Sequence, residues 1–399
     1  CSAAFAALLF SLHPMRVEPV VWASARRDLV CAFFALLTVL AWLRAVRPSE
    51  RNSRRWLAAA IAAYLLSLMS KVAVVSLPFV LVLLDLYPLK RLPLSPRRWL
   101  QPSLRDLWLE KAPFFLLAFI FAAIGVVAQV QCGAMATLAQ SGWTDRAIHA
   151  LYGFVFYIGK TLWPTELSPL YEYNAHSYAP TLAVGAAALA GFCSLARVPR
   201  FRPIVAAALA YYLITLSPAL VVRLASQRAA DRYSYLACLV WALLCGAGFR
   251  QWMKTRTAAA WDRGVLPGAV LASILLGALC VQTVRQERIW EDSTTFWRAV
   301  VRLDPDVSVG RPNLAEALFG VNLVGEAVFY LEEQVRLFPE DSHSRQGLAQ
   351  VLADFGVKER DPACFHRLLG FENAGDGKCL KRSRRTSGSP SFQMQPSMK

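Results

Sequence analysis

The sequence predicts an all-α protein in which a bundle of membrane-spanning helices is followed by a more polar helical segment. The 399 residues are 56% hydrophobic, and their mean hydropathy is +0.38. Nine apolar stretches fill the chain up to about Val284, and the segment after them carries Pro305 and Pro339, which are 34 positions apart. Because charge is confined to short runs between the apolar stretches, a soluble enzyme with a single core is excluded.

The apolar stretches are the expected membrane spans. Several are shorter than the roughly 20 residues that a helix needs to cross a bilayer, so their ends must extend into flanking residues or the helices must tilt. The expected spans are residues 1–12, 29–44, 56–70, 73–88, 112–130, 181–196, 203–222, 234–249 and 265–284.

Basic residues between the spans predict the orientation. If the spans alternate, the loops on one side carry eighteen Lys or Arg and those on the other side carry nine. The richer loops are 44–56, 89–111, 196–203 and 250–263, and the poorer ones are 13–28, 70–72, 129–180 and 223–233. The positive-inside rule places the richer set in the cytoplasm, so everything after Val284 is expected in a periplasm or lumen.

The net charge of +16 fits the same interpretation. The basic residues lie mainly beside apolar stretches, where they orient a membrane protein and meet anionic lipid headgroups. We therefore expect membrane lipid and no nucleic acid among the partners. The membrane is either a bacterial inner membrane or, in a eukaryote, the endoplasmic reticulum membrane.

One apolar stretch, residues 148–164, does not fit the alternation. Counting it as a crossing would move the basic loops 196–203 and 250–263 to the outer side, against the charge rule. We therefore expect an interfacial or re-entrant helix, anchored at the boundary by Trp143, Tyr157, Lys160 and Trp163. An ordinary tenth span is the alternative.

The polar segment, residues 285–357, has the pattern of a tetratricopeptide repeat. In residues 313–339, small and large apolar side chains fall where two antiparallel helices would pack, and Pro339 closes the second helix. These positions are Leu314, Ala315, Leu318, Ala327 and Leu331, and a further repeat begins at Gly347, Leu348, Ala349 and Leu352. Since about three repeats are needed for a continuous core, this array must lean on the membrane domain or continue elsewhere.

The two ends of the chain differ from the rest of the sequence. Residues 358–399 are basic, Ser-rich and without periodicity, which is typical of a disordered tail or a reading-frame artefact. The chain begins at Cys1 directly in an apolar stretch, so we expect additional sequence upstream. No two of the nine Cys residues have the spacing of a zinc site, and we assign no metal, including to His149 and His176.

Ionisable residues in the poorer set of loops are the candidate binding residues. Arg26, Lys71, Arg223 and Arg232 could together hold the phosphate or pyrophosphate of a membrane lipid, because cations offset phosphate charge most where water is scarce. Asp231 could orient Arg232, with Tyr233 stacked beside it. For any one of these cations, snorkelling to the membrane surface is the alternative. Asp85, near a span end, is expected to pair with a cation rather than relay protons.

Four motifs, in order, resemble those of the tetratricopeptide-repeat membrane O-mannosyltransferases and their bacterial relatives. They are HPMRVEPVVWASARRDLVCAFFALLTVLAW, SKVAVVSLPFVLVLLDLYPL, LWPTELSPLYEY and AADRYSYL. With the attached repeats, the resemblance covers residues 1 to about 355. This family belongs to the C-type glycosyltransferases, which have a many-helix membrane fold, take sugars from polyprenyl phosphates and react on the outer face.

The resemblance implies a function and the residues that serve it. The expected reaction transfers a sugar, mannose or another hexose, from a polyprenyl phosphate to an acceptor hydroxyl on a protein. Lys71 and Arg232 are implied near the donor phosphate, with His13, Glu18 and Arg26 in support; Asp28 shares their loop. We expect no resident cofactor, with a divalent cation left open.

The sequence departs from the family pattern at several positions. Val72 replaces a Glu, Arg16 stands where the relatives often have His, and Asp231 replaces a Glu. The catalytic carboxylate that would act as general base is expected upstream of Cys1. Two alternative functions stay open: a non-catalytic membrane scaffold whose repeats recruit partners, and a transporter or flippase for lipid-linked anions.

Overall fold

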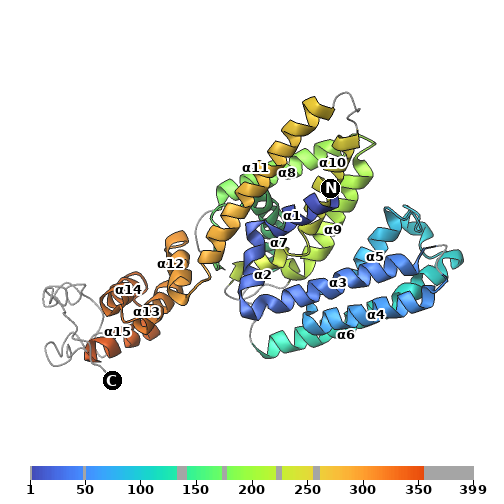
Figure 1. Ribbon diagram of the computed structural model, residues 1–399. Coiled ribbons are helices and arrows are strands. Elements are labelled where there is room, and N and C mark those ends of the chain that lie inside the picture. Colours follow the sequence, from blue (N-terminus) through green and yellow to red (C-terminus); the bar gives the residue numbers. More distant parts are fainter. Residues whose placement is uncertain are drawn as a thin grey trace, which may run out of the picture. The chain divides into compact units, whose positions relative to one another are not determined.

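The computed structural model describes residues 2–47, 51–132, 142–172, 178–221, 227–254 and 261–354. Within these residues the fold is helical apart from one short antiparallel pair of strands. The chain divides into two compact units, Cys1–Glu291 and Asp292–Lys399, each taken by itself below (Figure 1). The first unit ends later than the expected residue 284 because helix α11, Trp261–Arg288, continues past that point. The predicted tail, residues 358–399, lies outside the described residues.

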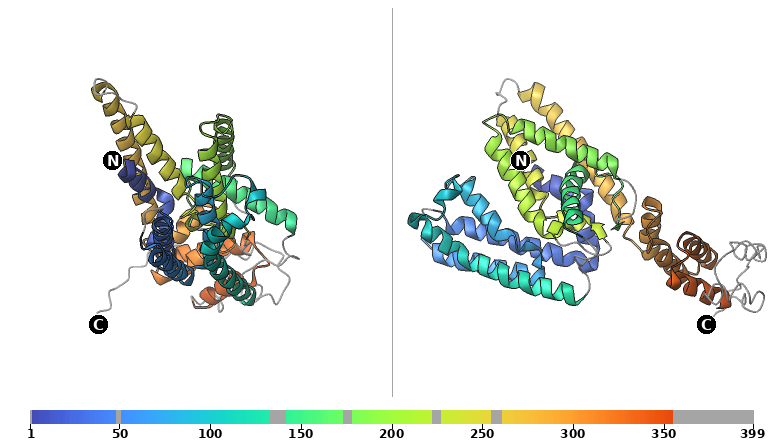
Figure 2. Two further views of the ribbon diagram at one scale, coloured as in Figure 1. Left: turned by 90° about the vertical axis from the view of Figure 1, so that its right-hand side faces the viewer. Right: turned by 180° about the vertical axis from the view of Figure 1, so that it is seen from behind.

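The first unit begins with short helices and a helical hairpin. Its elements up to residue 131 are α1 (Ser2–Ser11), η1 (Pro14–Arg16), α2 (Val17–Val21), η2 (Ala23–Ala25), α3 (Arg26–Ala45), α4 (Ser53–Ser70), η3 (Val72–Val74), α5 (Leu77–Leu86), η4 (Pro96–Arg98), η5 (Pro102–Leu104) and α6 (Arg105–Gln131). Helices α3, α4 and α6 run side by side (Figures 1 and 2). Their shared core contains Trp42, Tyr64 and Phe114, all fully buried.

The rest of the first unit packs around a second aromatic core. Its elements are α7 (Trp143–Leu162), β1 (Tyr171–Glu172), α8 (Ala179–Leu195), α9 (Arg202–Val221), β2 (Gln227–Ala229), η6 (Asp231–Ser234), α10 (Leu239–Lys254) and α11. Helices α7 and α8 touch through glycines: a Cβ on Gly159 would lie 2.1 Å from the Thr181 carbonyl oxygen, and one on Gly185 would lie 2.2 Å from that of Val155. These two positions therefore require glycine.

Among the residues that the structure describes, four helical segments are long and apolar enough to cross a membrane, by length and composition. They are Ala23–Ala45, Pro102–Gln131, Arg202–Leu220 and Pro267–Arg288, and the bent pair Ser2–Ser11 and Pro14–Val21 would make a fifth. Val72–Leu86 and Ala179–Leu195 are shorter apolar helices. Such helices are consistent with a membrane protein. The full set of nine spans stays a prediction.

Helix α7 corrects one expectation about residues 148–164. Helix α7 is not among the four long apolar helices named above. The correction concerns its anchors: two of the four residues expected at the membrane boundary are buried inside the protein instead. Tyr157 is buried, and its hydroxyl donates to the Ala230 carbonyl, 3.0 Å away. Lys160 is fully buried, and its ammonium donates to backbone carbonyls, which offsets the cost of its burial. Trp143 and Trp163 are exposed.

The expected pairing of Asp85 is confirmed. Its fully buried carboxylate accepts from Arg91 Nη1 at 3.1 Å and forms an ion pair with Lys111, which comes from α6 and is also fully buried. Arg91 reaches Glu110 as well, at 2.8 Å. A buried carboxylate held between two cations ties α5 to α6, which fits a structural role.

In its described part, residues 292–354, the second unit contains four helices: α12 (Ser293–Leu303), α13 (Gly310–Gly320), α14 (Val324–Leu337) and α15 (Ser342–Asp354). Helix α12 begins with a capping box between Asp292 and Thr295. Seven of the expected packing positions are buried and form one core with Val335; they are Leu314, Ala315, Leu318, Ala327, Leu331, Leu348 and Ala349. Gly347 is half-buried, and the side chain of Leu352 lies outside the described residues. The helical hairpins and this core fit a helical repeat.

Candidate functional site

An ion pair joins the first loop to the segment before α10. Glu18, in α2, is almost completely buried and forms a salt bridge with Arg232 of η6, and it also accepts the Arg232 backbone N–H at 2.9 Å. The Arg232 guanidinium stacks on Trp22 and Tyr233, with 5.1 and 4.9 Å to the ring centroids. The partners are 214 residues apart in sequence, so this contact fixes the tertiary arrangement of the two segments.

A second ion pair lies beside the first. Asp28, in the first turn of α3, pairs with Lys71 at the end of α4. The Lys71 ammonium also lies 5.8 Å from the centroid of the Tyr233 ring, and Tyr233 is in contact with Arg232. Tyr233 therefore lies between the two cations. We call Glu18, Asp28, Lys71, Asp231 and Arg232 the loop charge cluster.

The predicted phosphate-binding cations are not equally placed. Lys71 and Arg232 each have a carboxylate partner, so a phosphate must share these cations with Asp28 and Glu18 or displace the carboxylates. Arg26 is exposed at the start of α3. Arg223 lies outside the described residues.

Asp231 connects the cluster to the segment after α7. Its buried carboxylate accepts from the Tyr171 hydroxyl at 3.1 Å, and β1 and β2 pair Tyr171 with Ala229 just before it. Burial, and then the nearby Glu18 charge, raise the pKa of Asp231 to about 7. Asp231 thus does not form a salt bridge with Arg232, its neighbour in sequence, which pairs with Glu18 instead.

Lys160 was not predicted as a site residue, yet its charge is close to Asp231. Its ammonium donates to the carbonyls of Thr165 and Glu166, at 2.7 and 3.1 Å, and lies 4.8 Å from the Tyr178 ring centroid. Burial lowers the pKa of Lys160 to about 8, although the Asp231 and Glu166 charges act in the opposite direction. A Lys in an otherwise apolar stretch was the available sequence signal, but it was interpreted as an interfacial anchor.

His13 ties the first loop to α7. Its Nε2–H donates to the Thr161 carbonyl at 2.9 Å, while Nδ1 accepts the Met15 backbone N–H at 3.3 Å. A carbonyl can only accept and a backbone N–H can only donate, so this arrangement requires the neutral Nε2–H tautomer. His13 therefore has a positioning role in this structure.

All four sequence motifs converge at this place. The first loop contacts the second motif through Asp28 and Lys71, and the fourth through Glu18 and Arg232. The third and fourth motifs meet where Tyr171 bonds Asp231. In the part of the chain that the structure describes, no three His, Cys, Asp or Glu residues are grouped as metal ligands.

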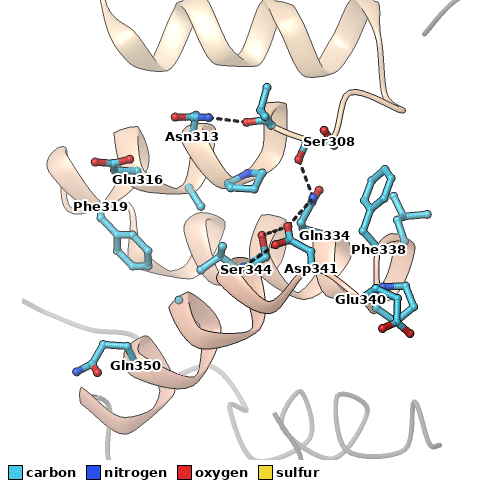
Figure 3. A pocket seen from close by; sticks show the side chains of 17 residues that line it. Ser308, Asn313, Glu316, Phe319, Gln334, Phe338, Glu340, Asp341, Ser344 and Gln350 are labelled. Atoms are coloured by element: carbon cyan, nitrogen blue, oxygen red, sulfur yellow. Dashed lines mark hydrogen bonds between the residues drawn. The ribbon is translucent and has the colours of Figure 1, made fainter. Parts of the chain in front are cut away.

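The second unit carries a separate cavity of about 1000 Å³ on the face formed by α13, α14 and α15 (Figure 3). Polar side chains that line this cavity are hydrogen-bonded to their neighbours. The Gln334 amide donates to the Ser308 carbonyl at 2.7 Å, and the Ser344 hydroxyl donates to the Asp341 carboxylate at 2.6 Å. Phe319 and Phe338 supply apolar wall. The charged residues among its lining are all acidic, namely Glu316, Glu340 and Asp341.

Comparison with known proteins identifies no relative of this chain. No protein-family model matches this sequence, and neither a curated protein nor a solved structure matches it significantly. The functional argument therefore depends on the residues and their geometry.

Proposed function

We propose that the chain is part of a membrane glycosyltransferase that moves a sugar from a polyprenyl phosphate to an acceptor hydroxyl on a protein. The observation that carries this proposal is the convergence of the four motifs of the resemblance on one charged cluster. They are far apart in sequence, but they meet through the contacts of Glu18, Asp28 and Asp231. Buried ionisable groups beside membrane helices are costly, which favours a functional role.

In the proposed reaction the acceptor hydroxyl attacks the anomeric carbon of the sugar. The carbon–oxygen bond to the carrier breaks, the polyprenyl phosphate leaves with the bonding electron pair, and the hydroxyl proton passes to a general base. Lys71, Arg232 and Arg26 would stabilise the negative charge that grows on the leaving phosphate. Asp231 is buried and engaged with Tyr171, so we do not assign it as the general base that accepts this proton.

The proposal also assigns sides of the membrane. The excess of Lys and Arg in the loops 44–56, 89–111, 196–203 and 250–263 favours a cytoplasmic position for those loops. The loop charge cluster and the helices after Val284 are then periplasmic or luminal, where a lipid-linked sugar and a protein acceptor are both accessible. The second unit would act as a tetratricopeptide-like module that holds the acceptor.

A paired substitution tests the transferase without leaving a lone buried charge. Asp28→Asn with Lys71→Gln removes the cation and its partner together, so the fold should persist while transfer from a polyprenyl-phosphate sugar falls by at least about tenfold, the factor for each 1.4 kcal/mol of lost transition-state stabilisation. The matched control is Arg298→Gln with Glu326→Gln, an exposed ion pair of the second unit. The full-length protein is assayed in membranes. Wild-type turnover in the first double variant would exclude the proposed role of Lys71.

A second candidate function is a membrane scaffold that recruits proteins through the second unit. The cavity on α13, α14 and α15 favours it, because acidic and aromatic lining suits a basic peptide segment. Glu316→Gln with Glu340→Gln should weaken binding of a Lys-rich peptide and reduce its salt dependence. Unchanged binding at low salt would contradict this function. Capture of partners by a chain that lacks transfer activity would favour the scaffold over the enzyme.

A further inference from the structure

A second cavity, in the first unit, contains a buried cation that has no ion-pair partner among the described residues. It measures about 220 Å³ and lies between α1, the end of α7, the start of α10 and α11. Arg16 lines it and is only 4% exposed. Nε and Nη1 of Arg16 have no hydrogen-bond partner among the described residues. A buried charge without such partners is expensive, so this position calls for a ligand or a compensating contact.

The contacts of Arg16 compensate only part of that cost. Its guanidinium lies 5.0 Å from the Phe10 ring centroid and 5.6 Å from that of Tyr235, so it makes a favourable cation–π contact with each ring. Stacking uses the face of the guanidinium and leaves its N–H groups, which lie in the plane, without acceptors. His13, beside it, is neutral and already fully hydrogen-bonded.

The remaining lining defines the ligand chemistry. Trp241 also lines the cavity, and its indole Nε1–H is a second buried donor without a partner in the described part of the chain. Arg and Trp side chains only donate, so the missing group must accept hydrogen bonds, and beside Arg16 it should be anionic. No Asp or Glu is among the lining residues that the structure describes; Asp231 is the carboxylate whose charge interacts with Arg16.

The rest of the wall is apolar and reaches a candidate membrane helix. Leu9, Leu162, Leu275 and Leu279 contribute to it, and Leu275 lies on α11 with 45% of its surface exposed. Pockets that enclose a drug-sized ligand measure roughly 300–1000 Å³, so this cavity has room for a head group and the first carbons of a chain. The remainder of the chain would lie against α11 in the bilayer.

We propose that this cavity binds the anionic head group of a single-chain membrane amphiphile, with Arg16 and Trp241 as its hydrogen-bond donors. The head group is a phosphate monoester or a carboxylate, which share the chemistry that the donors recognise. The site is distinct from the loop charge cluster, whose cations have carboxylate partners. The proposal does not rest on sugar transfer, and binding should persist in the variant that combines Asp28→Asn with Lys71→Gln.

The test measures binding of dodecyl phosphate, dodecanoate and dodecanol to the full chain in a neutral detergent, by equilibrium binding and by the shift in melting temperature. At least one of the two anions should bind the wild type at least tenfold more tightly than dodecanol, and which of them does so identifies the head group. Arg16→Met should abolish that preference, while Arg27→Met, an exposed arginine outside the cavity, should retain it.

Folding provides an internal control. Without ligand, Arg16→Met should melt at the wild-type temperature or above it, because the substitution removes an unpaired buried charge. If that variant fails to fold, Trp241→Phe keeps a ring in place, removes one donor and should weaken anion binding severalfold. Equal binding of dodecanol, or wild-type anion binding by a folded Arg16→Met variant, would overturn the proposal.

Discussion

Replacing Arg232 with Met removes the cation that faces Glu18 and leaves that carboxylate buried. Glu18 is 4% exposed, so it cannot recover much hydration in the folded state. Breaking a buried pair from one side costs about 3–5 kcal/mol. The Arg232 backbone N–H still donates to Glu18 at 2.9 Å, which favours the lower end of that range. Loss of the guanidinium stacking on Trp22 and Tyr233 adds about 0.5–1 kcal/mol for each ring.

A double-mutant cycle separates the ion pair from these packing losses. Glu18→Gln in the same chain as Arg232→Met removes the stranded charge, and we expect the double variant to be at least about 1.5 kcal/mol more stable than Arg232→Met alone. The assay is unfolding of the purified chain in mild detergent, followed by its apparent melting temperature. With the stacking included, Arg232→Met loses about 4–5 kcal/mol, and at about 2–4 °C for each kcal/mol it should melt about 8–20 °C below the wild type.

The result that refutes this reasoning is additivity. If the double variant loses the sum of the two single losses, Glu18 and Arg232 do not interact in solution as they do in the structure. A loss below about 1 kcal/mol for Arg232→Met would mean that Glu18 is hydrated or protonated.

Three further predictions concern the core and the titrating groups. The pKa of Asp231 is about 7 in the folded state, whereas the pKa of an unfolded Asp is about 3.9. The stability of the wild type should therefore fall as the pH rises between those two values and then level off. Asp231→Asn should flatten that fall in melting temperature, and an unchanged pH profile would contradict the raised pKa. Gly159→Ala should destabilise the first unit by about 1–3 kcal/mol, because its Cβ would overlap the Thr181 carbonyl. The control Gly191→Ala places a Cβ with no atom within 4 Å and should leave the melting temperature unchanged. Equal melting temperatures of the two variants would contradict the close contact between the helices. Leu318→Ala should cost about 2–5 kcal/mol in the second unit, measured by its denaturation midpoint, since Leu318 is fully buried, and a smaller loss would contradict that core.

The sequence was most informative where structure depends on near neighbours. Helix positions follow from runs of apolar residues, and the core positions of the second unit follow from spacing alone, as Leu314, Leu318 and Ala327 show. The pairing of Asp85 with Arg91 could also be predicted, because the two residues are six positions apart and meet at a helix end. Both expectations needed only local information.

The sequence indicated part of the loop charge cluster, but it did not indicate which residues pair. The expected residues Glu18, Asp28, Lys71 and Arg232 do meet, because the motifs that contain them converge. Which carboxylate neutralises which cation could not be deduced, and Arg232 pairs with Glu18 rather than with adjacent Asp231. The proximity of Lys160 to Asp231 depends on how α7 packs against the strands.

What the sequence by itself determined is the helical character, the apolar stretches, and the separation between an apolar first unit and a more polar second one. Hydrophobicity and spacing are properties of adjacent residues, so a linear chain displays them directly. Only the tertiary structure decided that Lys71 and Arg232 have carboxylate partners, while two N–H groups of Arg16, beside a cavity, have no acceptor among the described residues. Burial and ion pairing join positions as far apart as 214 residues, and their energies depend on distance and solvent exposure, which no local pattern contains.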